Sequence, residues 1–157
     1  MSKKKKGIED FFTEYALHFN SAMSDEQSDV GPWVQRSFAD CFIESSPLGV
    51  QCGKNDDGLL KKIKEGFDFY KGIGSQAMNI VSKDITLLDD FHAMVKVYWR
   101  YAYVNDNKPG TIDFHVVYFL TLVNNEIKIF AYITGDEQKV LKERGLIQEE
   151  ELLTKQK

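Results

Sequence analysis

The sequence predicts an α+β fold in which N-terminal helices pack on one face of a strongly curved antiparallel sheet. Three observations support this fold class. Apolar residues recur every three to four positions in the first half of the chain, as in amphipathic helices. They recur every second position in the second half, as in strands with one buried face. The turns between the alternating segments are short, so consecutive strands should pair antiparallel.

Three helices are expected in the first half of the chain. The first spans 8–24 and the second runs from about residue 31 to residue 38, where a proline suits the first helical turn. The third spans 58–71, because residues 55–58 offer an N-cap and two glycines follow its last turn. Between the second and third helices, residues 38–52 mix short extended pieces with a turn.

Four strands and a short helix are expected in the second half. The strands are 76–88, 91–104, 111–123 and 126–134, each with period-two alternation of apolar side chains. The helix spans 137–144, between a capping aspartate and a terminating glycine. Helices followed by an antiparallel meander are typical of α+β proteins.

The turns fix a pairing register, and the register sorts the strand residues into two faces. With 105–110 as a loop, Val104 opposes Thr111, and a tight turn at 124–125 fixes the next pair of strands. The alternation slips at 82–84, which predicts a bulge. The uncharged face should lie under the helices and contains Ala93, Val95, Val97, Trp99, Tyr101, Tyr103, Ile112, Phe114, Val116, Tyr118, Leu120, Leu122, Ile127, Ile129, Ala131 and Ile133.

The opposite face combines charged side chains with an aromatic cluster. Its residues include Lys96 and Lys128 beside several rings, too many for a purely solvated surface. An apolar patch with a charged rim is typical of a protein interface. We therefore expect a homodimer that forms through Tyr98, Arg100, Phe119, Phe130 and Tyr132.

Composition and charge exclude several classes of function. The net charge is −4, so the chain lacks the basic field of a nucleic-acid-binding protein. No apolar run approaches the ~20 residues of a membrane-spanning helix, and no signal peptide is expected. A single cytoplasmic domain is predicted at 8–146, with a disordered basic tail at 1–7 and a frayed tail at 147–157. Cys41 and Cys52 are expected to be buried free thiols.

Aromatic side chains with a polar atom are prominent on the predicted inner surface. Such rings can hydrogen-bond a ligand while they pack against it, or they can simply fill the core. We expect some of them to line a pocket for a small apolar or aromatic molecule. The six candidates are Tyr15, Trp33, Tyr70, Trp99, Tyr101 and Tyr118.

Asp113 and His115 are the weak candidates for catalysis. They lie two residues apart on one strand and share a face, so the carboxylate could orient the imidazole for acid–base chemistry. In the predicted register they lie on the outer face, with His115 opposite Arg100, and would then be structural. No metal-ligand spacing or cofactor motif is present, so we expect neither a metal nor a cofactor.

The order of elements and the closing sequence KIFAYITGDE at 128–137 resemble the nuclear transport factor 2-like superfamily, which includes ketosteroid isomerases and SnoaL-like cyclases. The resemblance covers about 8–146. It implies a cone-shaped α+β barrel with a pocket at its open end, often dimeric through the outer face of the sheet. It also raises the alternative of an isomerase, cyclase or dehydratase. The isomerases use inward acidic groups, and the predicted inner face of the last three strands has none.

Overall fold

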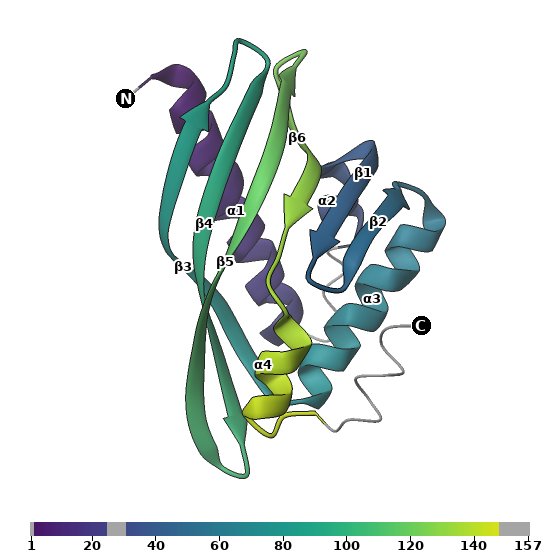
Figure 1. Cartoon of the computed structure of the whole chain (residues 1–157), viewed down its shortest axis with the longest axis vertical. Coiled ribbons are helices and arrows are strands. Elements are labelled where there is room, and N and C mark those ends of the chain that lie inside the picture. The colour runs from purple at the N-terminus through teal and green to yellow at the C-terminus, as the bar shows by residue number, and fades with distance from the viewer. Residues whose placement is uncertain (1, 25–30, 148–157) are drawn as a thin grey trace.

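The computed structural model describes residues 2–24 and 31–147, and it confirms the predicted fold class (Figure 1). Within these residues, four helices accompany a six-stranded sheet that is strongly curved and does not close. The helices are α1 (Lys3–Ser24), α2 (Gly31–Arg36), α3 (Asp57–Gly72) and α4 (Glu137–Glu143). The strands are β1 (Phe38–Ser46), β2 (Gly49–Lys54), β3 (Ser75–Leu87), β4 (His92–Asn105), β5 (Lys108–Val123) and β6 (Glu126–Ile133).

The strands are arranged in the order β2-β1-β6-β5-β4-β3, so β2 and β3 form the two edges. Neighbouring strands are antiparallel except for β1 and β6, which are parallel. The extended pieces expected within 38–52 are therefore a hairpin that joins the sheet beside β6. The hairpin forms one edge of the sheet, and α3 lies beside it (Figure 1).

Helix α1 begins earlier than the sequence predicted. Residues 3–7, expected to be a disordered tail, form its first turns. Lysine is a good helix former, and these side chains extend into solvent while Ile8 and Phe12 are completely buried against the sheet. The ammonium group of Lys4 donates to the carbonyl oxygen of Asp90 at 3.1 Å, which fixes this end of the helix against the β3–β4 turn.

The β4–β5 hairpin has a tighter turn than expected. Asp106 and Asn107 have positive φ angles of 51° and 63°, so a two-residue turn replaces the predicted loop, and Val104 opposes Pro109. The predicted register was wrong by two residues, a shift that leaves every side chain on its predicted face. Burial alternates strictly along β4, and Val97 is fully buried as expected.

A bulge changes the predicted faces of β6. Leu120 pairs with Ile129 in the predicted register, but the residue before Leu120, Phe119, pairs with Ala131. Beyond this bulge Tyr132 faces the helices and Ile133 is 45% exposed, the reverse of the prediction. Tyr132 was expected in the outer interface and is instead part of the inner surface.

Two apolar clusters stabilise the fold. The larger lies between α1 and the sheet and includes Phe12, Trp99 and Leu120, each at most 1% exposed. The smaller lies beneath α4, where Leu141 and Ile147 cover the far end of β4 and β5. Ile147, placed in the predicted frayed tail, is thus buried, and the rest of that tail lies outside the described residues. None of the described helices is both long and apolar enough to span a membrane.

Candidate functional site

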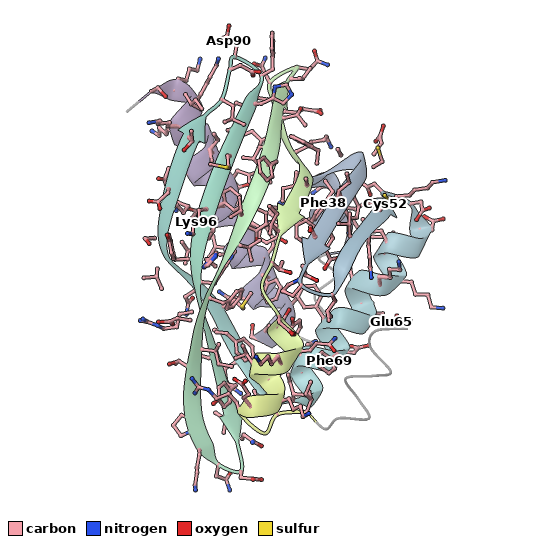
Figure 2. All side chains as sticks on the ribbon, in the orientation of Figure 1. Phe38, Cys52, Glu65, Phe69, Asp90 and Lys96 are labelled. Carbon is pink, nitrogen blue, oxygen red and sulfur yellow. The ribbon has the colours of Figure 1, made fainter. Side chains whose placement is uncertain are left out.

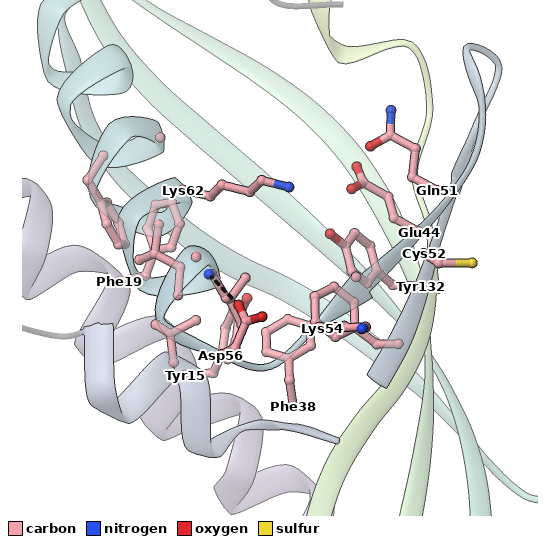
Figure 3. A pocket seen from close by; sticks show the side chains of 18 of the residues that line it. Tyr15, Phe19, Phe38, Glu44, Gln51, Cys52, Lys54, Asp56, Lys62 and Tyr132 are labelled. Atoms are coloured by element: carbon pink, nitrogen blue, oxygen red, sulfur yellow. Dashed lines mark hydrogen bonds between the residues drawn. The ribbon is translucent and has the colours of Figure 1, made fainter. Parts of the chain in front are cut away.

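A cavity of about 490 Å³ lies where the helices meet the β1–β2 hairpin (Figure 3). Helices α1, α2 and α3 form one side of it, and β1, β2 and β6 form the other. The lining residues come from six elements and the loop before α3. They are Tyr15, Phe19, Val34, Phe38, Phe42, Glu44, Gln51, Cys52, Gly53, Lys54, Asp56, Gly58, Leu59, Lys62, Ile63, Gly66, Phe67, Tyr70 and Tyr132.

Local sequence fixes the walls of this cavity. The carboxylate of Asp56 accepts from the backbone N–H of Leu59 at 3.3 Å and so caps α3 at the cavity rim. Gly53 of β2 is required by close packing, because a Cβ there would lie 2.5 Å from the ring of Phe42. Gly66 differs, since a Cβ there would meet no atom within 4 Å. The middle of α3 therefore borders open space.

Aromatic rings line both sides of the cavity. Phe38 and Phe42 have ring centroids 4.9 Å apart, and Tyr132 lies 6.0 Å from Phe38 and 6.4 Å from Phe42, stacked on the latter. Across the cavity, Phe19 of α1 packs on Phe67 of α3 at 4.9 Å. Side chains on the outer side of the sheet, such as Lys96 (Figure 2), play no part in this wall.

One end of the cavity is polar. Glu44 and Gln51 project from the β1–β2 hairpin toward the side chain of Lys62 on α3, and the hydroxyl of Tyr132 lies beside Glu44 (Figure 3). Burial, reinforced by the negative charge of Glu44, strongly raises the pKa of Tyr132. Burial also raises the pKa of Tyr15 to about 12. These phenols stay protonated at neutral pH and can donate hydrogen bonds.

Glu137 is not part of the cavity lining, but it places a second carboxylate against the lining residue Tyr70. It begins α4, and one of its carboxylate oxygens accepts a hydrogen bond from the hydroxyl of Tyr70. The residue as a whole is exposed, whereas protein atoms crowd around its carboxylate. This burial, together with the negative charge of Glu44, raises the pKa of Glu137 from 4.5 to about 7. A carboxyl group that titrates near neutral pH can exchange protons with a ligand.

The structure divides the six predicted pocket residues. Tyr15 and Tyr70 line the cavity. The other four do not: Trp33 packs on Tyr15 at 5.7 Å, Trp99 and Tyr118 are buried in the core, and Tyr101 belongs to the cluster beneath α4.

The sequence interpretation missed Glu44, Tyr132 and Glu137. Phe42 and Glu44 are two residues apart, so recognising β1 as a strand would have placed both on one face. Tyr132 was missed because the bulge was not apparent from the alternation. Glu137 was treated only as a helical residue following a cap, and its proximity to Glu44 depends on tertiary structure.

The weak catalytic candidates lie outside the cavity. Asp113 opposes Arg100 across β4 and β5 and receives two hydrogen bonds from its guanidinium, of 2.8 and 2.9 Å. These bonds lower the pKa of Asp113. His115 is exposed on the same outer face, with its ring 5.9 Å from that of Tyr98.

The cysteines and histidines provide no metal site among residues 2–24 and 31–147, where no group of three or more potential ligand side chains was found. Cys41 and Cys52 are free thiols, as expected. The expectation that they are buried was wrong, because both lie on the exposed hairpin of β1 and β2. The sulfur of Cys52 points away from the cavity (Figure 3).

Solved structures share this fold at low sequence identity. An NTF2-like protein with a cystatin-like fold from Novosphingobium aromaticivorans aligns with a TM-score of 0.65 at 9% identity, covering 92% of this chain and 88% of that one. A ketosteroid isomerase-like protein from Erwinia carotovora atroseptica gives 0.61 at 16% identity, with coverages of 86% and 97%. An NTF2-like protein of unknown function from Shewanella oneidensis gives 0.57 at 15%, with coverages of 81% and 98%.

A curved, unclosed sheet around a long N-terminal helix, with a cavity beside the helices, defines an NTF2-like protein. The family model described as NTF2-like protein (DUF6841) matches residues 3–137, and the chain belongs to this family. The match includes the early turns of α1 and ends at Glu137. A comparison with curated protein sequences found no match.

Proposed function

We propose that this protein binds a small apolar or aromatic molecule in the cavity between α3 and the β1–β2 hairpin. The observation that carries this proposal is the cavity of about 490 Å³, within the range of roughly 300–1,000 Å³ typical of ligand sites. Its walls are mainly aromatic and aliphatic, while Glu44, Gln51 and Lys62 concentrate polar groups at one end. Such an arrangement buries an apolar body and orients it through a few polar contacts.

Filling the cavity from α3 tests this proposal. A leucine at Gly66 projects into open space that belongs to the cavity, so Gly66→Leu should occlude the ligand without displacing the wall. The helix should tolerate the change, because glycine costs roughly 1 kcal/mol in a helix interior. Gly72→Leu is the matched control, since Gly72 lies in the same helix, has equally open space and does not line the cavity.

The measurement is the change in melting temperature with increasing naphthylethanol, followed by calorimetric titration. Binding to the folded state alone should raise the melting temperature of the natural protein and of Gly72→Leu. Gly66→Leu should lose at least about tenfold in affinity while unfolding at the same or a higher temperature. Equal binding by Gly66→Leu and Gly72→Leu would place the ligand elsewhere and refute the proposal.

We also propose that two copies associate through the outer face of the sheet. Tyr98, Arg100, Phe119 and Phe130 all lie there, with the rings of Phe119 and Phe130 6.2 Å apart. The apolar surface continues across β6, β1 and β2, where the side chains are strongly exposed. Relative exposures are 45% for Ile133, 46% for Ile43 and 67% for Val50. An apolar sheet face of this kind is better stabilised in an interface than in water.

An acid–base enzyme of the isomerase, cyclase or dehydratase kind is the alternative. Its specific support is the carboxylate of Glu137, which lies against the lining residue Tyr70 and has a pKa raised to about 7. Asp113 and His115 give no support, because they face away from the cavity. If the alternative is correct, Glu137→Gln should abolish turnover of a candidate substrate and His115→Ala should leave it unchanged. The opposite pattern would reject Glu137 as the acid–base group.

A further inference from the structure

We propose that the ligand carries a protonated amine, which the carboxylates of Glu44 and Glu137 bind at the polar end of the cavity. This inference rests on the proposed function and specifies the chemical class of the molecule. It follows from the position of the two carboxylates: Glu44 lines the cavity beside a cluster of aromatic rings, and Glu137 lies against the lining residue Tyr70.

Neither carboxylate forms an ion pair within the described part of the chain. Ion pairs were found at four places among the described residues, and neither Glu44 nor Glu137 takes part in any of them. Glu44 comes from β1 and Glu137 from the start of α4, so the fold holds two like charges close enough to affect each other's ionisation. A ligand ammonium group can relieve this repulsion and donate charge-assisted hydrogen bonds.

Aromatic rings lie directly beside Glu44. Tyr132 contacts this carboxylate and also packs against Phe38 and Phe42. Cations are attracted to the negative faces of aromatic rings, and the attraction increases in a site that excludes water. The carboxylate and the aromatic cluster therefore favour the same kind of ligand group. The rest of the cavity, with Phe19 and Phe67, provides an apolar wall for the body of the ligand.

The cationic side chains of the lining are less well placed than Glu44 to determine the charge of the ligand. Lys54 and Lys62 are both exposed, and neither forms an ion pair among the described residues. Lys62 reaches across the cavity from α3, toward the side occupied by Glu44 (Figure 3). A long, solvated side chain at the rim can move aside at little cost, whereas Glu44 is partly buried on a strand. An anionic ligand would instead depend on these lysines.

The direction of proton transfer on binding distinguishes a cationic ligand from an anionic one. The groups around the Glu137 carboxylate are Glu44 from β1 and the Tyr70 hydroxyl from α3, with Tyr132 of β6 beside Glu44. With a pKa of about 7, Glu137 is about half protonated at neutral pH. An ammonium group nearby favours the charged carboxylate, so binding should release protons near pH 7. An anionic ligand would cause proton uptake.

The experiment compares three probes that share one aromatic body: naphthylethylamine, naphthylethanol and naphthylacetate. Alkylamines remain protonated below pH about 9, as lysine does. Calorimetric titration at pH 7 in two buffers of different ionisation enthalpy measures affinity and proton transfer together. We expect the amine to bind at least about tenfold more tightly than the alcohol and to release protons. We expect the acetate to bind more weakly than the alcohol.

Isosteric variants of the two glutamates test whether their carboxylates cause the preference for the amine. Glu44→Gln and Glu137→Gln should each remove most of the advantage of the amine, and Glu137→Gln should also abolish proton release. Lys96→Gln, a control on the outer side of the sheet and away from the cavity (Figure 2), should preserve both. Equal or tighter binding of the alcohol or the acetate would overturn the amine inference while the proposed function stands. If none of the three probes binds, the proposed function fails with it.

Discussion

The carboxylates of Glu137 and Asp113 show how surroundings determine the chemistry of a single side chain. Asp113 lies on the solvated outer face, where two hydrogen bonds from Arg100 favour its charged form and lower its pKa. Glu137 accepts a hydrogen bond from Tyr70 of the cavity lining, and crowding and the charge of Glu44 favour its neutral form. The sequence spacing drew attention to Asp113 beside His115. Sequence alone could not identify Glu137, because burial and long-range charge create its unusual ionisation.

Glu137→Gln should change the pH dependence of stability. In the folded protein the pKa of Glu137 is about 7, above the usual 4.5 of the unfolded chain. Between these values the unfolded chain binds fewer protons, so this group makes the folded state less stable as the pH rises from 4.5 to about 7. Glutamine does not titrate. The stability of Glu137→Gln relative to the natural protein should therefore rise across this window and then level off.

Urea unfolding at several pH values between about 3 and 9 measures this effect. Asp113→Asn is the control with the opposite sign. The lowered pKa of Asp113 gives stability that is present above its unfolded pKa and is lost as the pH falls through its folded pKa. A pH-independent difference between Glu137→Gln and the natural protein would show that the Glu137 carboxylate is not perturbed.

At the scale of elements, regular patterns were predictable and local irregularities were not. Strand β4 alternates without interruption, so its bounds and buried face followed from the sequence. In β6 the apolar residues alternate without a break, so Ile129 and Ala131 were both assigned to the inner face. Only the pairing with β5 reveals the bulge that turns Tyr132 inward. The start of α1 was missed because four consecutive lysines resemble a solvated tail, although lysine favours helices.

Loss of the α3 N-cap should destabilise the element that forms one wall of the cavity. In Asp56→Ala the backbone N–H of Leu59 loses its side-chain acceptor, and the free energy of unfolding should fall by about 1 kcal/mol. Asp56→Asn keeps a good capping group and should lose much less. Urea unfolding curves of the two variants test this difference. Equal stabilities would show that the cap contributes nothing in the folded protein.

At the scale of the whole molecule, the two faces of the sheet have separate roles. The inner face holds α1 over Trp99 and Tyr118, and these rings complete the core instead of lining the cavity. The cavity lies beside α1, between α3 and the β1–β2 hairpin (Figure 1). Its location depends on how these elements lie in space, so the sequence could predict a pocket near α1 and α3 but could not select most of its lining.

The apolar outer face of the sheet leads us to predict a dimer. Burying the apolar surface that runs from Phe119 on β5 to Val50 on β2 should stabilise a dimer of about 36 kDa, twice the 18.1 kDa of one chain. Sedimentation equilibrium at micromolar concentration measures this mass. Val50→Lys should dissociate the dimer without unfolding the chain, because Val50 is 67% exposed and would bring a charge into the interface.

The matched control is Leu17→Lys, which places the same charge at a residue of α1 that is 64% exposed. It should remain dimeric, because α1 packs on the opposite face of the sheet. Phe119→Lys tests the centre of the proposed interface, and its circular dichroism must show that it is folded. Dissociation by Leu17→Lys but not by Val50→Lys would place the interface on the helices. A monomeric natural protein would show that the apolar outer face remains exposed to water.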